Sequence, residues 1–197
     1  MRAALLVVAV AFGIARGDAP IGAVAVLDKP VAIVGDAVLW QSRVDERMTG
    51  REAKDRPQLI EDMIDELIWL RAAKQASITV EPGEVLAALD EIKQQNKLDD
   101  AGLDAALKQQ GYTRDRYLVD LGNQLIILRA RNQLVLMHIV VEDSEIDAHA
   151  KANGKTLPLS ASDRDDLRRD MRRERGDTAA AKWHAEQKRR SHIERRR

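Results

Sequence analysis

The chain is 197 residues long, which is enough for one domain or for one domain with an extension. Hydrophobic residues make up 45% of it and aromatic residues only 3%, so the core must consist mainly of Leu, Ile, Val and Ala. The formal net charge is +0, which gives no argument from the whole chain for binding nucleic acid. Cysteine is absent, which excludes disulfides, thiolate metal sites and cysteine nucleophiles.

Residues 1–17 have the pattern of a secretory signal peptide, with Arg2, an apolar run and then small residues. Ala15-Arg16-Gly17 is the expected cleavage site, because Pro20 disfavours cleavage after Ala19. The apolar run is short for a spanning helix, although an uncleaved inner-membrane anchor is the alternative. Either way the remainder is exported, and an exported chain without cysteine favours the bacterial periplasm. Residues 18–29 are expected to be a linker, and 30–197 a single domain.

The domain is expected to open with a β-hairpin. Two β-rich runs, 31–34 and 37–40, flank the turn pair Gly35-Asp36. Ser42 is placed to cap a short helix that reaches Met48. An isolated hairpin is only marginally stable in water, so this one needs another element to pack against.

Residues 57–77 predict an amphipathic helix. Apolar side chains recur at three- and four-residue steps from Ile60 to Ile68, which is the period of one helical face. Acidic residues fill the first half of the outer face and Arg71 comes late, as the helix dipole favours. Burying each Leu, Ile or Met of this face stabilises the fold by roughly 1.5–3 kcal/mol. The later helices are the expected partners.

Three more helices are expected to follow, joined by short connections that imply antiparallel neighbours. Each has a recognisable start or end signal. A long apolar stripe marks the third of them, at Tyr117, Leu121, Leu125, Leu128 and Val135. The three are 82–95, which Pro82 and Glu84 begin; 99–111, which Gly111 ends; and 113–138, which Thr113 caps.

The last third of the chain predicts two helices separated by a break at 153–158. Residues 141–146 repeat the helix-start pattern of 80–85. From Ser162 a long charged helix is expected, supported by opposite charges at three- and four-residue spacing, with Gly176 as a weak spot. Residues 191–195 contain one apolar residue, so the pattern alone predicts a frayed tail.

The sequence contains no recognisable catalytic or metal-binding pattern. The four histidines do not pair at ligand spacing on one helical face, and nucleophile-elbow and phosphate-loop motifs are absent. Asp99-Asp100 is interpreted as a solvated helix start. We therefore expect no metal, no cofactor and no catalytic residue. The basic C-terminus could contact an anionic membrane surface, but it lacks interleaved aromatics, so nucleic acid is not expected.

Three stretches, in this order, resemble the SurA-like periplasmic chaperones, the SurA N-terminal domain family. Together they cover nearly all of the chain after residue 29. The resemblance implies a mainly α fold in which an N-terminal hairpin opens a helical body (30–153), and a long C-terminal helix and a strand return to it (160–197). Trp183 would lie in that helix, and 192–195 would form the strand. The stretches are VAIVGDAVLWQSRVDERM; RPQLIEDMIDELIWLRAAKQASITVEPGEV with GYTRDRYLVDLGNQLIILRARNQLV; and AAKWHAEQKRRSHIERR.

The sequence departs from the family in one respect. Such chaperones can carry parvulin-type isomerase modules, each of which needs on the order of a hundred residues. Only a few residues around 153–158 separate the helix at Ile146 from the final helix. We therefore expect the module to be missing and prolyl isomerase activity to be absent, unless a module acts in trans.

The resemblance implies an ATP-independent periplasmic holdase that binds unfolded outer-membrane protein precursors and assists their folding and assembly, with the outer-membrane assembly machinery as a further partner. A client groove needs exposed apolar side chains. The alternatives are a prolyl isomerase-family protein and a self-associating envelope scaffold, and both monomer and dimer stay open. The groove candidates, which lie off the main stripes or near element ends, are Trp40, Leu70, Leu118, Ile127 and Met137.

Overall fold

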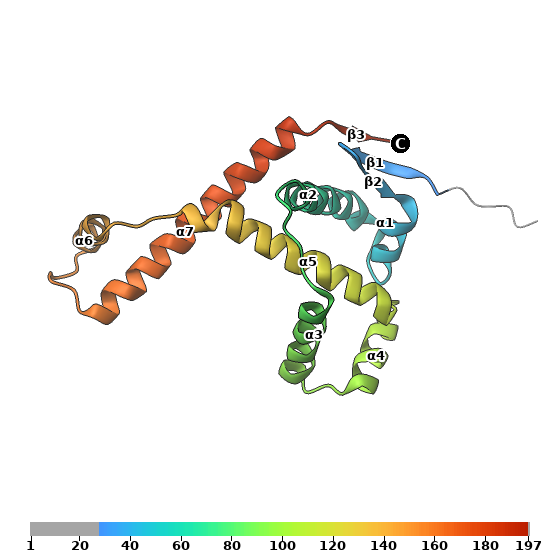
Figure 1. Cartoon of the computed structure of the whole chain (residues 1–197), viewed down its shortest axis with the longest axis horizontal. Coiled ribbons are helices and arrows are strands. Elements are labelled where there is room, and N and C mark those ends of the chain that lie inside the picture. The colour runs from blue at the N-terminus through green and yellow to red at the C-terminus, as the bar shows by residue number, and fades with distance from the viewer. Residues whose placement is uncertain (1–27, 197) are drawn as a thin grey trace, which may run out of the picture.

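The computed structural model describes residues 28–196, so the predicted signal peptide and most of the predicted linker lie outside the described residues. The described part is mainly helical, with a small sheet and a long C-terminal helix, which confirms the predicted fold class (Figure 1). In chain order the elements are β1 (Pro30–Val34), β2 (Ala37–Trp40), α1 (Gln41–Met48), the 3-10 turn η1 (Ala53–Asp55), α2 (Arg56–Gln75), α3 (Pro82–Asn96), α4 (Asp100–Gln109), α5 (Arg114–Leu134), the 3-10 turn η2 (Leu136–His138), α6 (Asp143–Ala152), α7 (Ala161–Arg190) and β3 (Ile193–Arg195).

The sheet joins the two ends of the described chain. Its order is β2-β1-β3, and β1 pairs antiparallel with both neighbours, setting Val34 opposite Ile193. The Gly35 amide donates to the His192 carbonyl, which adds a bond between the hairpin turn and the returning chain. The strand implied by the family resemblance is therefore confirmed. The frayed tail that the charge pattern predicted is wrong, because Ile193 packs against the sheet's core and the backbone supplies the remaining bonds.

Within residues 28–196, three separate apolar clusters hold the sheet and helices α1 to α5 together. The first lies between the sheet, α1 and α2 and contains the fully buried Val34, Val44 and Ile64. The second joins α3, α4 and the first half of α5 around Leu121. The third is where α2 crosses α5, at Ala73 and Ala130 with Ile78. The predicted apolar face of α2 is thus buried, but α5 is shared between two clusters.

The predicted helix starts are largely confirmed. Pro82 lies in the first turn of α3, and the Thr113 hydroxyl accepts from the Arg116 amide to cap α5. The predicted cap at Ser42 is wrong, because α1 begins one residue earlier and Ser42 lies inside its first turn. The Asp28 carboxylate instead accepts bonds from the amide and the hydroxyl of Ser42. The long helix predicted to reach residue 138 ends at Leu134 and continues as η2.

The C-terminal half of α7 is docked on α2 by stacking and by charge. The indole rings of Trp69 and Trp183 stack with centroids 4.3 Å apart. The Lys188 ammonium reaches the Asp65 carboxylate at 2.6 Å, and the Arg195 guanidinium donates twice to Glu61. Much of the predicted basic tail is therefore engaged within the molecule.

The N-terminal half of α7 projects away from the sheet and carries α6 (Figure 1). We call residues 143–175 the arm. Within it, Ile146 and Ala150 are buried, and the guanidinium of Arg175 donates two bonds to Glu145. Chiefly through these bonds, Arg175 lowers the pKa of Glu145 to about 2.

The predicted weak spot in α7 is instead a point of close packing. The helix runs without a break through Gly176, which is buried. A Cβ atom added there would lie 2.7 Å from Leu136 Cδ2 of η2. Glycine therefore allows α7 to pass close against η2, just after the end of α5. This contact lies where the arm joins the rest of α7.

Trp183→Ala tests how α7 is attached. We expect it to lower the free energy of unfolding by about 2–4 kcal/mol, because it removes the stacking partner of Trp69 and leaves a gap between two helices. Trp40→Ala, which truncates a more exposed indole outside this interface, is the matched control and should cost about 1 kcal/mol or less. Urea unfolding followed by circular dichroism measures both. Equal losses for the two variants would contradict the proposed role of the stack.

Candidate functional site

An open, mainly apolar hollow lies along α5, against α3. It has a volume of about 730 Å³ and adjoins a second hollow of about 510 Å³ against α7. The two share Asn132 and Leu136, so we treat them as one site, the cradle. The lining residues are Val80, Glu84, Ala87, Ala88, Glu91, Leu125, Leu128, Arg129, Asn132, Gln133 and Leu136 in the first hollow, with Arg169, Asp170, Arg172, Arg173 and Asp177 added in the second.

The floor of the cradle is apolar and open to solvent. Leu128 is 64% exposed, and Leu125 and Leu136 are half-buried. This exposure follows from how α5 packs, since Ala130 faces α2 and Leu121 faces α3 and α4, leaving Leu128 without a covering element. Leu128, which belongs to the long apolar stripe predicted for this helix, therefore lies outside the core. Exposed apolar patches of this kind on soluble proteins often mark sites of interaction.

Charged pairs border the cradle on both walls. On the α3 wall, the Arg129 guanidinium donates to Glu84 and to the Thr79 carbonyl, which ties the start of α3 to α5. The bond from Arg129, together with the bond from the Glu81 amide, lowers the pKa of Glu84. On the α7 wall, Arg131 of α5 pairs with Asp177 at 2.6 Å. The walls are thus positioned by ion pairs, and the floor by apolar packing.

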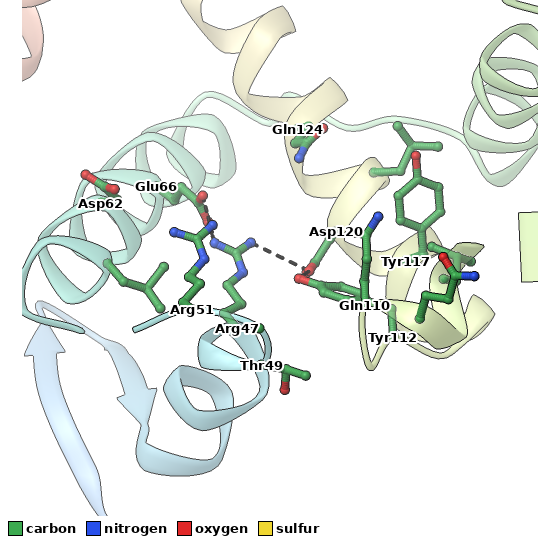
Figure 2. A pocket seen from close by; sticks show the side chains of 15 residues that line it. Arg47, Thr49, Arg51, Asp62, Glu66, Gln110, Tyr112, Tyr117, Asp120 and Gln124 are labelled. Atoms are coloured by element: carbon green, nitrogen blue, oxygen red, sulfur yellow. Dashed lines mark hydrogen bonds and ion pairs between the residues drawn. The ribbon is translucent and has the colours of Figure 1, made fainter. Parts of the chain in front are cut away.

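Apart from the cradle, a polar hollow of about 520 Å³ lies between α1 and α2 on one side and α4 and α5 on the other (Figure 2). Arg47 lies between two carboxylates there, 2.8 Å from Glu66 and 3.7 Å from Asp120. Asp120 is buried and also accepts from Arg43 at 3.0 Å and from the Tyr112 hydroxyl at 3.3 Å. Burial, with the charge of Asp120, raises the pKa of Tyr112.

This polar cluster links two parts of the fold. Arg43 and Arg47 come from α1, which packs in the first apolar cluster, and Asp120 comes from α5, which packs in the second. Asp120 was not among the residues predicted from sequence. An acid directly before Leu121, on the inward side of an apolar helix, was the available signal, because a buried carboxylate needs cationic partners. We assign the polar cluster to positioning α5.

The five residues predicted to bind clients are dispersed over the structure. Trp40 ends the edge strand β2 and is 40% exposed, and Met137 of η2 is 62% exposed. Leu70 of α2, Leu118 and Ile127 of α5 are half-buried, and Leu118 packs in the second cluster. None of the five lines the cradle or the polar hollow. Their role in client binding stays a prediction.

Among residues 28–196, no group of three or more His, Asp or Glu side chains is gathered closely enough to hold a metal ion. In the same range no single helix is both long and apolar enough to span a bilayer. One pair of segments together reaches the length and apolar composition of a membrane span, but the pair is bent by 89° at its break. The two segments are Arg114–His138 and Asp143–Ala152.

Comparison with known proteins decides the family. The family model of the SurA N-terminal domain matches residues 27–131, which is more than half of the chain. The chain belongs to the SurA N-terminal domain family. It is also 35% identical over 165 residues to the Chaperone SurA of Thiobacillus denitrificans, covering 77% of this chain and 37% of that protein. The Chaperone SurA of Chromobacterium violaceum is 34% identical over 147 residues, covering 68% and 34%.

The chain therefore spans roughly a third of the length of these SurA relatives. Among solved structures, it is similar to a chain from a study of two structurally related SurA-like chaperones of Campylobacter jejuni. That match has a TM-score of 0.48 and 18% identity, and it covers 64% of this chain and 50% of that one.

Asp120→Ala tests the polar cluster. We expect it to lower the free energy of unfolding by about 3–5 kcal/mol, because it leaves buried guanidinium groups without their carboxylate. Asp177→Ala, which removes the exposed partner of Arg131, should cost less than about 1 kcal/mol. Chemical denaturation of both variants measures the difference. A small loss for Asp120→Ala would mean that the arginines find other partners and that Asp120 does not position α5.

Proposed function

We propose that this chain is an ATP-independent chaperone that holds unfolded proteins in the cradle. Membership of the SurA N-terminal domain family supports the proposal, as do relatives named Chaperone SurA. The observation that carries it is the open apolar floor, in which Leu128 is 64% exposed within a hollow of about 730 Å³.

The cradle is suited to weak and reversible contacts. Covering a leucine that is 64% exposed gains roughly 1–2 kcal/mol. Several such contacts are needed to hold an unfolded segment, and each can be lost separately. Binding of this kind needs no nucleotide for release, because folding of the client buries the same apolar side chains more completely.

We propose the periplasm as the place of action and outer-membrane protein precursors as clients. The signal-peptide pattern of residues 1–17 supports export. Strands of outer-membrane barrels alternate apolar and polar residues, so an extended precursor segment has one apolar face to lay on the cradle floor. The outer-membrane assembly machinery is the expected further partner.

We propose that the chain acts by holding clients and not by isomerising prolyl bonds. Residues 153–160 directly connect α6 to α7, so the described chain contains no inserted module at that point. The chain is expected to leave unchanged the refolding rate of a protein that is limited by prolyl isomerisation. Acceleration above the uncatalysed rate in a fluorescence refolding assay would contradict this proposal.

Leu128→Glu tests the cradle in a light-scattering assay on a urea-unfolded outer-membrane barrel protein. The unaltered chain, from residue 18 onward, is expected to suppress scattering near stoichiometric ratio. Leu128→Glu should require about threefold more protein or higher for the same effect, because it places a charge on the apolar floor. Val119→Glu is the matched control, since Val119 is 55% exposed on the same helix but outside the cradle.

The outcomes separate the site from the activity. Equal suppression by both variants would be consistent with a chaperone whose client site lies outside the cradle. Trp40→Glu and Met137→Glu would then test the surface residues predicted from sequence. Failure of the unaltered chain to suppress scattering, where a known holdase succeeds, would contradict the chaperone proposal itself. The self-associating scaffold would then become the working hypothesis.

A further inference from the structure

We propose that the α7 wall makes the cradle prefer unfolded client segments in which carboxylate side chains lie next to apolar ones. This inference rests on the proposed function and adds the chemistry of the client. Arg169, Arg172 and Arg173 all line the hollow of about 510 Å³ that adjoins the apolar floor. A segment that sets an apolar side chain on Leu136 therefore has its neighbouring residues beside three guanidinium groups. The same wall also carries two carboxylates, Asp170 and Asp177, which are paired with Arg173 and Arg131.

These three arginines are available to a client. Arg172 is exposed and lies within ion-pair distance of no carboxylate among residues 28–196. Arg169 and Arg173 pair only with acids three residues earlier on α7, and in both pairs each side chain is more than half exposed. Exposed pairs of this kind contribute little, so a client carboxylate can replace Asp166 or Asp170 at small cost.

The other arginines in the first half of α7 are not available in the same way. Arg164 and Arg168 pair with Asp147 and Asp143 of α6, and Arg175 binds Glu145 with two bonds. Their charges are used within the arm. The first half of α7 therefore carries two sets of arginines: one set binds α6, and the other set lines the cradle.

The α3 wall of the cradle, in contrast, presents to a client a carboxylate that is unpaired among the described residues. On α3, Glu84 is bound by Arg129, while Glu91 is exposed and has no cationic partner within ion-pair distance in the described range. A client carboxylate is therefore repelled near α3 and attracted near α7. Because the formal net charge of the whole chain is +0, such a preference must come from this local arrangement and not from a general attraction.

The test uses two fluorescein-labelled peptides with the same apolar centre and with blocked termini, one flanked by aspartates and the other by lysines. Fluorescence anisotropy at low salt is expected to show the acidic peptide binding about three- to tenfold more tightly. The difference should shrink at high salt, because exposed charges are screened. A third peptide with uncharged flanks measures binding to the apolar floor alone.

The variant Arg172→Glu should weaken or abolish the preference between the acidic and basic peptides, because a carboxylate then replaces the guanidinium of the α7 wall that is unpaired within the described range. The matched control is Arg189→Glu, because Arg189 is an exposed arginine of the same helix, without an ion pair among residues 28–196, and outside the cradle. This control should keep the preference. Thermal unfolding followed by circular dichroism establishes that both proteins are folded.

Equal binding of the acidic and basic peptides by the unaltered chain would overturn the inference, while binding of the uncharged peptide would leave the proposed function standing. Loss of the preference in Arg189→Glu would also overturn it, since the effect would then reflect net charge and not the α7 wall. If none of the three peptides binds, the proposed function itself fails.

Discussion

The docking of the C-terminal segment on α2 is the interaction on which the rest of the arrangement depends. The stack of Trp69 on Trp183 and the carboxylates of Glu61 and Asp65 fix the second half of α7. Because α7 is one uninterrupted helix, fixing that half also sets the direction of the arm (Figure 1). One wall of the cradle is therefore positioned by contacts made at the other end of a 30-residue helix.

The other wall and the floor depend on α5, which is shared between packing partners. Apolar contacts with α2 hold one stretch of it, and α3 and α4 hold another, while Asp120 binds it to the arginines of α1. A helix divided in this way cannot bury its whole apolar surface. Leu128 is left exposed by the geometry of the fold, although nothing in its own side chain distinguishes it from its buried neighbours.

This explains which predictions from sequence succeeded. Most helix starts, the hairpin turn and the apolar face of α2 depend on local patterns, and these were predicted correctly, with the cap at Ser42 as the exception. The position of Leu128 depends on where two other helices cross α5, which periodicity does not encode. The short strand at Ile193 also has no local signal, because its partners lie far away in sequence, and only the family resemblance indicated it.

The two kinds of contact in the proposed site differ in how they respond to conditions. Apolar contacts on Leu128 scale with buried area and persist in salt, whereas guanidinium contacts on the α7 wall are exposed and screened. A holdase benefits from this combination, because the apolar floor supplies most of the affinity and the charges bias which segment binds and how fast it arrives. The arm supplies the charged wall, while α5 and η2 supply the apolar floor, so the position of the arm decides how closely the two kinds of contact approach each other. Any change in the docking of α7 should therefore alter selectivity before it alters the capacity to hold unfolded chains.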